Sequence, residues 1–131
     1  MKFFTIIDGC SMAEISLKDI RERKEKRRKL LETELVRISE QLKAMGALKI
    51  IVFGSYAEGH VRSTSDLDII AIMPPTMSGK KWMLKVYDEI DRNVDCDILC
   101  YTPEELENLI PVSGFIRHAI KTGKVIYEKG T

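Results

Sequence analysis

Residues 54–68, with the sequence GSYAEGHVRSTSDLD, decide the fold because they join two apolar runs. The run at 49–53 is rich in β-branched residues and stops at Gly54, and the run at 67–73 stops at a pair of prolines. Short runs of this composition, bounded by such residues, are typical of buried strands. The sequence therefore predicts two neighbouring strands joined by a polar connection.

The two ends of this connection carry groups suited to phosphate chemistry. In an antiparallel pair, Gly54 and Ser55 lie beside Asp66 and Asp68, whose two-residue spacing puts both carboxylates on one face of the sheet. Paired carboxylates repel each other, and a divalent cation such as Mg²⁺ relieves that repulsion. A Gly-Ser turn offers backbone N–H groups and a hydroxyl to phosphate oxygens. This combination indicates metal-assisted phosphoryl transfer.

The rest of the chain alternates between helical and strand patterns. Helices are predicted at 13–45, 78–92, 103–110 and 113–122, and further strands at 95–101 and 125–127. The 78–92 helix can act as a right-handed crossover, which makes the strand at 95–101 parallel to the one at 67–73. The order predicts an α/β or α+β fold with a small mixed sheet of three or four strands. We expect the helices mainly on one face, with the face that carries the carboxylates left open.

A two-metal site needs a third carboxylate, and the strand at 95–101 offers two. Asp95 and Asp97 are two residues apart and therefore lie on one face. The parallel arrangement would bring the start of this strand level with Asp66 and Asp68. Geometry alone does not choose between Asp95 and Asp97.

The ordered motifs resemble the signature of the nucleotidyltransferase superfamily of the DNA polymerase β type, which is Gly-Ser, about ten residues, then Asp-x-Asp. Residues 97–105, DILCYTPEE, are similar to the strand and helix start that carry the third carboxylate in the minimal nucleotidyltransferases, the short stand-alone members. Residues 115–128 resemble the usual end of that family, so the resemblance covers about residues 30–128. It implies that Asp97 is the third carboxylate.

The resemblance also implies a substrate and a role for each motif residue. The expected residues are metal-binding and catalytic Asp66, Asp68 and Asp97, and nucleotide-binding Gly54, Ser55 and Ser65. Two Mg²⁺ ions and ATP or another NTP would bind there. Asp97 would also help to deprotonate the attacking hydroxyl. The expected reaction moves a nucleoside monophosphate, AMP in the case of ATP, to a hydroxyl and releases pyrophosphate.

The sequence leaves the acceptor open. Minimal nucleotidyltransferases resemble one half of a toxin–antitoxin pair whose other half is a helical protein of the HEPN type. A Tyr hydroxyl of such a partner is therefore the expected acceptor, and self-association is also expected. The alternatives are a non-catalytic module that neutralises this partner by binding, and a transferase that acts on RNA or a small molecule. A third carboxylate at Asp97 favours the enzyme, because a pure binding module does not need one.

The N-terminal part departs from the family pattern, which normally begins with one short helix. We divide the chain into an N-terminal extension with a charged helix at 1–29 and a nucleotidyltransferase domain at 30–131. Every residue from Arg21 to Lys29 is charged; seven are basic and two acidic, a sum of +5. Such runs usually form a solvated helical face, and the alternative is contact with RNA or an acidic partner.

The composition gives weaker information. The chain has 131 residues and a formal net charge of +1, which does not predict a nucleic-acid partner. No apolar run approaches the roughly 20 residues of a membrane span, so no membrane partner and a cytoplasmic location are expected. Cys10, Cys96 and Cys100 lack the C-x-x-C spacing of zinc and redox sites, and we expect reduced thiols.

Overall fold

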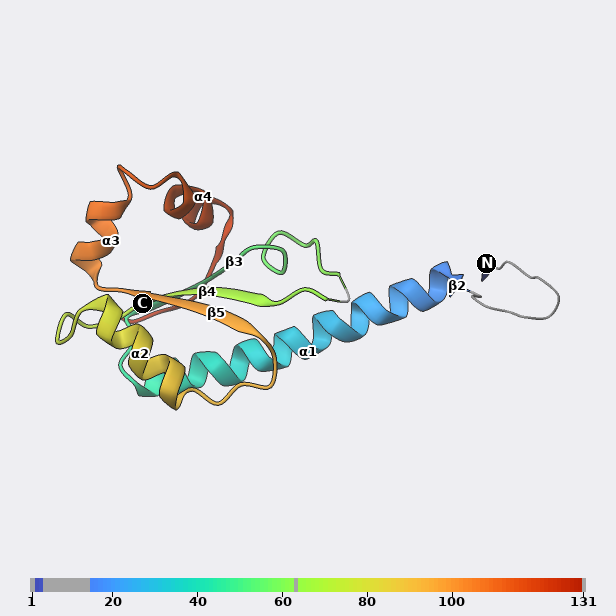
Figure 1. Cartoon of the computed structure of the whole chain (residues 1–131), viewed down its shortest axis with the longest axis horizontal. Helices are drawn as coiled ribbons and strands as arrows, with labels where there is room; N and C mark the ends of the chain where they lie inside the picture. Colours follow the sequence, from blue (N-terminus) through green and yellow to red (C-terminus); the bar gives the residue numbers. More distant parts are fainter. Residues whose placement is uncertain (1, 4–14, 63, 131) are drawn as a thin grey trace.

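The computed structural model describes residues 2–3, 15–62 and 64–130, and a four-stranded mixed sheet lies at its centre (Figure 1). Its strands are β3 (Lys49–Phe53), β4 (Leu67–Ile72), β5 (Cys96–Tyr101) and β6 (Lys124–Glu128). The spatial order is β5-β4-β3-β6, with β3 antiparallel to both β4 and β6, and β4 parallel to β5. The predicted mixed sheet and both strand directions are confirmed.

Two helices cover each face of the sheet (Figure 1). They are α1 (Leu17–Ala44), α2 (Gly79–Glu89), α3 (Pro103–Leu109) and α4 (Gly114–Thr122). The stripe Leu31, Leu35, Ile38 and Leu42 of α1 packs with Trp82 and Val86 of α2 against one face, and all are buried. The two longer helices, α1 and α2, share this face, and the shorter helices α3 and α4 lie on the other.

The second face is less open than we expected. Ile51 and Ile70 pack there against Ile116 and Ala119 of α4 in a separate apolar cluster. The region covered by α4 ends at Phe53. The Phe53 and Phe115 rings pack in a T-shaped arrangement, with their centroids 5.7 Å apart. Beyond Phe53 the sheet is uncovered, so the open region is confined to one end of this face.

Helix α1 starts later than predicted. The Ser16 side chain accepts the Asp19 N–H at 3.0 Å and caps the helix, while Ile15 and Ser16 form a short strand, β2 (Ile15–Ser16), with β1 (Lys2–Phe3). Residues 13–14, at the predicted start, lie outside the described residues. The proposed boundary between residues 29 and 30 falls inside α1, which is one continuous helix from Leu17 to Ala44. No helix among the described residues is long and apolar enough to cross a membrane.

Candidate functional site

The strand register gathers the predicted carboxylates at the open end of the sheet. Phe53, the last residue of β3, pairs with Asp68 of β4, and Asp68 in turn stands level with Asp97 of β5. Alternation along the strands puts both carboxylates on the face covered by α4, beyond the point where that cover ends. Asp66 lies two residues before Asp68, and Asp95 lies two residues before Asp97. The side chains of Asp66, Asp95 and Asp97 are exposed.

Gly54 allows the backbone to approach this cluster closely. Its φ is +81°, a conformation that residues with a side chain rarely adopt. A Cβ added at Gly54 would also collide with the Asp68 carboxylate, lying against Oδ2 and 3.2 Å from Cγ. The glycine therefore serves two purposes: it turns the chain out of β3, and it leaves room for a carboxylate against the backbone.

Ser55 begins a tight turn that follows β3. The Glu58 N–H donates to the Gly54 carbonyl at 3.0 Å, and the His60 N–H donates to the Ser55 carbonyl at 2.9 Å. Among the described residues, the hydroxyl and the N–H of Ser55 donate no hydrogen bond. The predicted binding of a phosphate oxygen by these two groups stays a prediction.

Ser65 is held within the protein. Its buried side chain accepts the Arg62 N–H at 2.7 Å, and its carbonyl accepts the Arg27 Nε–H at 2.7 Å. These bonds shape the turn that leads into Asp66. Its predicted part in nucleotide binding stays a prediction.

The acidic residues influence one another electrostatically. The pKa of Asp68 is raised from its ordinary value, first because the carboxyl is partly buried, and then because Asp97 and Asp66 are negatively charged neighbours. The same three carboxylates, together with a larger effect of burial, raise the pKa of the Cys96 thiol to about 12. A bound cation would relieve this repulsion.

Arg27 of α1 is the site residue that sequence analysis missed. Its Nη2 lies 3.3 Å from Oδ1 of Asp66, while its Nε–H holds the neighbouring carbonyl of Ser65. The helical pattern contains a signal for it, because Arg27 lies four residues before Leu31 and continues the buried stripe of α1 by one turn. The surrounding run of charges hides that signal.

The carboxylates do not already form a metal cage. Among the described residues, no group of three or more His, Cys, Asp or Glu side chains is arranged to hold a metal ion. Asp66 is instead paired with the guanidinium of Arg27. Carboxylate oxygens of this kind suit a hard divalent cation, and the participation of Asp66, Asp68 and Asp97 in a metal site stays a prediction.

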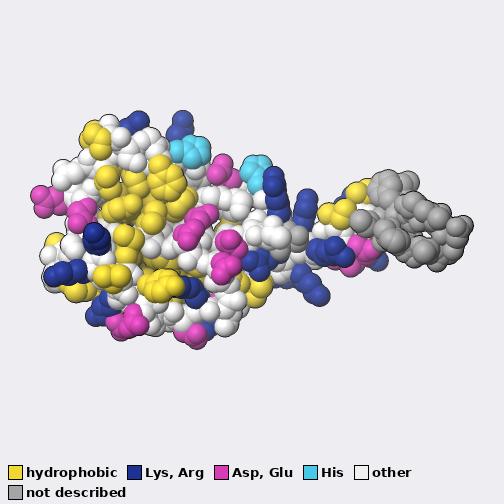
Figure 2. Space-filling view, viewed as in Figure 1, with side chains coloured by type: hydrophobic (Ala, Val, Ile, Leu, Met, Phe, Trp, Pro, Cys, Tyr) yellow, Lys and Arg dark blue, Asp and Glu magenta, His cyan; other side chains and the backbone are white. Residues whose placement is uncertain are grey.

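A cavity of about 680 Å³ lies beside Asp68 and Asp97. Its walls are largely apolar and come from α2, β5 and α4, and they include Phe53, Phe115 and Tyr87, with Lys80 and Arg92 as cationic members. Figure 2 shows an exposed apolar surface on this side of the molecule, with acidic side chains next to it. Volumes of this order are typical of small-molecule sites.

Comparison with known proteins agrees with this geometry. A Sulfolobus solfataricus protein, whose own assignment as a nucleotidyltransferase is provisional, has the same fold, with a TM-score of 0.54 and 18% identity over 84% of this chain and 87% of that one. A search of curated proteins gives no match. The family model described as "Polymerase beta, Nucleotidyltransferase" matches residues 36–131, which include β3 to β6 and all of the carboxylates described above. The chain therefore belongs to the polymerase β nucleotidyltransferase family.

Proposed function

We propose that the chain is a Mg²⁺-dependent transferase that moves a nucleoside monophosphate from a nucleoside triphosphate to a hydroxyl acceptor. ATP is the expected donor. The observation that carries this proposal is the position of Asp68 and Asp97, level in adjacent strands and at the wall of a largely apolar cavity of about 680 Å³. Ser55, whose N–H and hydroxyl donate no hydrogen bond among the described residues, lies just past the end of the strand beside them.

The chain's own groups can be given specific tasks. Asp68 and Asp97 would hold the metal, and Asp66 would join them after leaving Arg27. Bound Mg²⁺ would supply charge stabilisation at the phosphoryl oxygens. Exposed Asp97 would accept the proton of the attacking hydroxyl. Ser55 would hold phosphate oxygens through its N–H and hydroxyl groups.

The cavity beside the carboxylates would receive the nucleoside part of the donor. Phe53 and Phe115 offer aromatic surface to a base, and Lys80 and Arg92 offer positive charge to phosphates. The mouth of this cavity is open, so the acceptor can belong to a second molecule. We propose a Tyr hydroxyl of a helical, HEPN-type partner protein as this acceptor.

A labelling experiment tests transfer and acceptor together. The purified chain is incubated with Mg²⁺ and ATP labelled at the α-phosphate, in separate reactions with the product of the adjacent gene, with RNA and alone. Label on the partner protein supports the proposed acceptor, whereas label on RNA or on the chain itself reassigns it. Failure to label any of them, together with tight complex formation, would favour the non-catalytic binding module.

Asp97 and Asp95 form a matched pair of variants for the same assay. Asp97→Asn should lower the rate of labelling by roughly 100-fold or more, a loss of about 2.7 kcal/mol of transition-state stabilisation. Asp95→Asn should change it by less than roughly threefold, because Asp95 lies two residues before the position level with Asp68. The reverse ranking would show that the third carboxylate is Asp95.

A further inference from the structure

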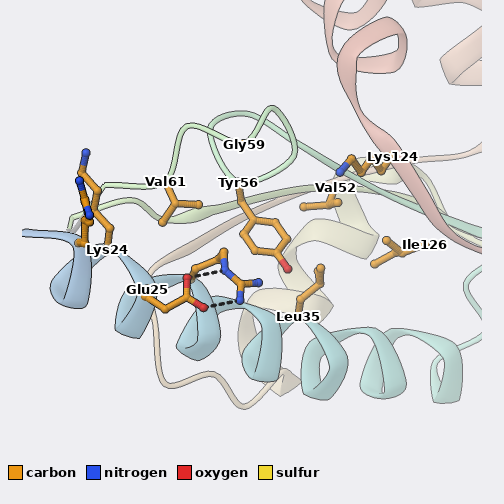
Figure 3. A pocket seen from close by; sticks show the side chains of 11 residues that line it. Lys24, Glu25, Leu35, Val52, Tyr56, Gly59, Val61, Lys124 and Ile126 are labelled. Atoms are coloured by element: carbon orange, nitrogen blue, oxygen red, sulfur yellow. Dashed lines mark hydrogen bonds and ion pairs between the residues drawn. The ribbon is translucent and has the colours of Figure 1, made fainter. Parts of the chain in front are cut away.

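A second cavity, of about 770 Å³, lies apart from the carboxylates (Figure 3). It is a groove between the N-terminal half of α1, the turn that follows β3, and strand β6 at the edge of the sheet. Its residues do not overlap with those of the cavity at Asp68 and Asp97. The proposed transfer reaction makes no use of it.

Positive charges converge on this groove from two elements. Arg21, Lys24 and Arg28 lie at intervals of three and four residues on α1, which puts them on one side of the helix. Lys124 comes from β6, and Figure 3 shows it at the opposite end of the groove from Lys24. Of the described residues that line the groove, Glu25 alone is acidic. The charged run is therefore not uniformly solvated, because one side of it forms the wall of a cavity.

Most of this positive charge is not neutralised within the protein. Arg28 is paired with Glu25 at 2.6 Å and with Glu32 at 3.2 Å. Among the described residues, Arg21, Lys24 and Lys124 form no ion pair. Like charges that face one groove repel one another, and an anion bound between them would remove that cost.

The floor of the groove is apolar and contains an aromatic ring. Tyr56 and Val61 come from the connection after β3, and Leu35 and Ile126 come from α1 and β6. Figure 3 shows the Tyr56 ring inside the groove, between the lysines at its two ends. A flat apolar group with an anionic attachment would therefore satisfy both parts of the lining. A nucleotide has this combination: its base stacks on aromatic side chains and its phosphate binds cations.

We propose that this groove binds single-stranded nucleic acid, with phosphates on Arg21, Lys24 and Lys124 and a base against Tyr56. Arg21 and Arg28 are about 10 Å apart along the helix axis, which is long enough to follow more than one phosphate of a strand. A duplex would keep its bases stacked inside and could not place one on the floor, so an unpaired strand fits better. Binding here goes beyond the proposed transfer reaction and does not require it.

The test is fluorescence anisotropy with a labelled, mixed-sequence RNA of about 12 nucleotides, which falls within the usual site sizes for such proteins. The variant Arg21→Gln/Lys24→Gln/Lys124→Gln should lower the affinity roughly tenfold or more at low salt. It should also flatten the slope of log affinity against log salt by about 2, since three phosphate contacts are lost. Tyr56→Leu should weaken binding roughly tenfold, whereas Tyr56→Phe should retain it. Thermal melts of each variant check that the fold is intact.

A matched control carries the same change in net charge elsewhere. Lys81, Lys121 and Lys129 are exposed and outside the groove, so replacing all three by Gln should leave most of the affinity intact. An equal loss in the groove and control variants would overturn the proposal, because binding would then follow net charge alone.

Two further ligands test whether the groove prefers a nucleic-acid strand to a single nucleotide or to an acidic peptide. AMP should bind at least roughly tenfold more weakly than the strand, because it offers one phosphate instead of several. Equal affinity for AMP, or equal affinity for a poly-glutamate peptide with the same dependence on Arg21 and Lys24, would overturn the assignment to a strand. Asp68→Asn should bind the RNA normally, which keeps this result independent of transfer activity.

Discussion

Gly54 has both a positive φ and a close contact with the Asp68 carboxylate, whereas Gly59 has only the positive φ. A comparison of the two glycines therefore separates the effects of these features. Both have positive φ values, +81° and +78°, but an added Cβ at Gly59 meets nothing within 4 Å. Gly59→Ala should therefore cost about 1–2 kcal/mol of unfolding free energy, the usual cost of this backbone conformation. Gly54→Ala should cost about 2–4 kcal/mol, because it also displaces the Asp68 carboxylate.

Urea unfolding measures both glycine variants, and nucleotide labelling then tests whether the displaced carboxylate matters. Gly54→Ala should lose labelling activity at temperatures where it remains folded, and Gly59→Ala should keep it. Equal stability losses in the two variants would show that the contact with Asp68 has no energetic consequence.

Asp68 is expected to destabilise the metal-free protein at neutral pH. Its pKa is raised in the folded state, so the folded protein binds the proton more tightly than the unfolded chain does. Stability therefore falls as the pH rises from the ordinary value of 3.8 through the raised value, and the full penalty remains above it. Asp68→Asn should increase the unfolding free energy at pH 7 by roughly 0.5–1 kcal/mol, since solvent screens this partly exposed group.

Thermal melts at several pH values check this sign. The advantage of Asp68→Asn should shrink as the pH falls through the raised pKa of Asp68, and it should be gone below 3.8, where the folded and unfolded wild type both carry the proton. Added Mg²⁺ should stabilise the wild type and have less effect on Asp68→Asn. A variant that is less stable than the wild type at pH 7 without metal would contradict the proposed repulsion.

Residue spacing predicted the position of Asp68 but could not supply the partner of Asp66. Two-residue alternation in neighbouring strands settles which carboxylates share a face, and the structure agrees. The contact between Arg27 and Asp66 joins residues 39 positions apart on different elements. Composition shows only that Arg27 belongs to a charged run. The direction in which the Arg27 side chain points depends on how α1 packs on the sheet.

At the scale of elements, α1 is held by polar contacts to the loop between α2 and β5 as well as by its apolar stripe on the sheet. Glu34 is only 2% exposed and accepts hydrogen bonds from Arg37 at 2.8 Å and from the Asn93 N–H at 2.8 Å. Burial alone would raise the pKa of Glu34, but these bonds to Asn93 and Arg37 lower it overall. Sequence analysis could not find this network, because an acidic residue in a helix is usually on the surface.

The contact of α1 with Asp66 predicts an effect on metal binding. In the proposed site, Arg27 and a divalent cation would compete for the Asp66 carboxylate, so Arg27→Ala should tighten the binding of Mn²⁺ by roughly threefold to tenfold, as expected for a partly exposed ion pair. Arg23→Ala removes the same charge from an exposed position on the same helix and should have a smaller effect. Electron paramagnetic resonance of free Mn²⁺ measures both affinities. Weaker binding in Arg27→Ala would show that Arg27 orders the site and does not compete with the metal.

At the scale of the whole molecule, the order of the elements predicted a mixed sheet and the directions of β4 and β5, but it did not predict that β6 lies beside β3. Each strand is bounded by clear breakers, and the parallel crossover leaves one handedness. The cover on the second face was underestimated, because α3 and α4 are short and their apolar residues are few. Ile116 and Ala119 become core residues only when α4 folds back over Ile51 and Ile70.

Cys100 of β5 provides a probe of global unfolding, because its side chain is fully buried. This burial raises the pKa of the Cys100 thiol to about 12, so little thiolate forms at pH 8 in the folded protein. In a Cys10→Ser/Cys96→Ser background, the Cys100 thiol should react with Ellman's reagent only as fast as the protein unfolds. Labelling of Cys100 at the rate of a free thiol in the native protein would contradict this prediction.

Because α1 is one continuous helix, the directions in which side chains point at its N-terminal end are fixed relative to those at its C-terminal end. Each residue of an α-helix turns the chain by about 100° and advances it by 1.5 Å. A single residue inserted after Lys29 would leave Leu31 to Leu42 seated on the sheet. It would, however, swing Arg27 away from Asp66 and turn Arg21 and Lys24 out of the groove. The charged segment is therefore sensitive to changes of length as well as to changes of residue type, because one insertion would displace Arg27 and the groove residues together.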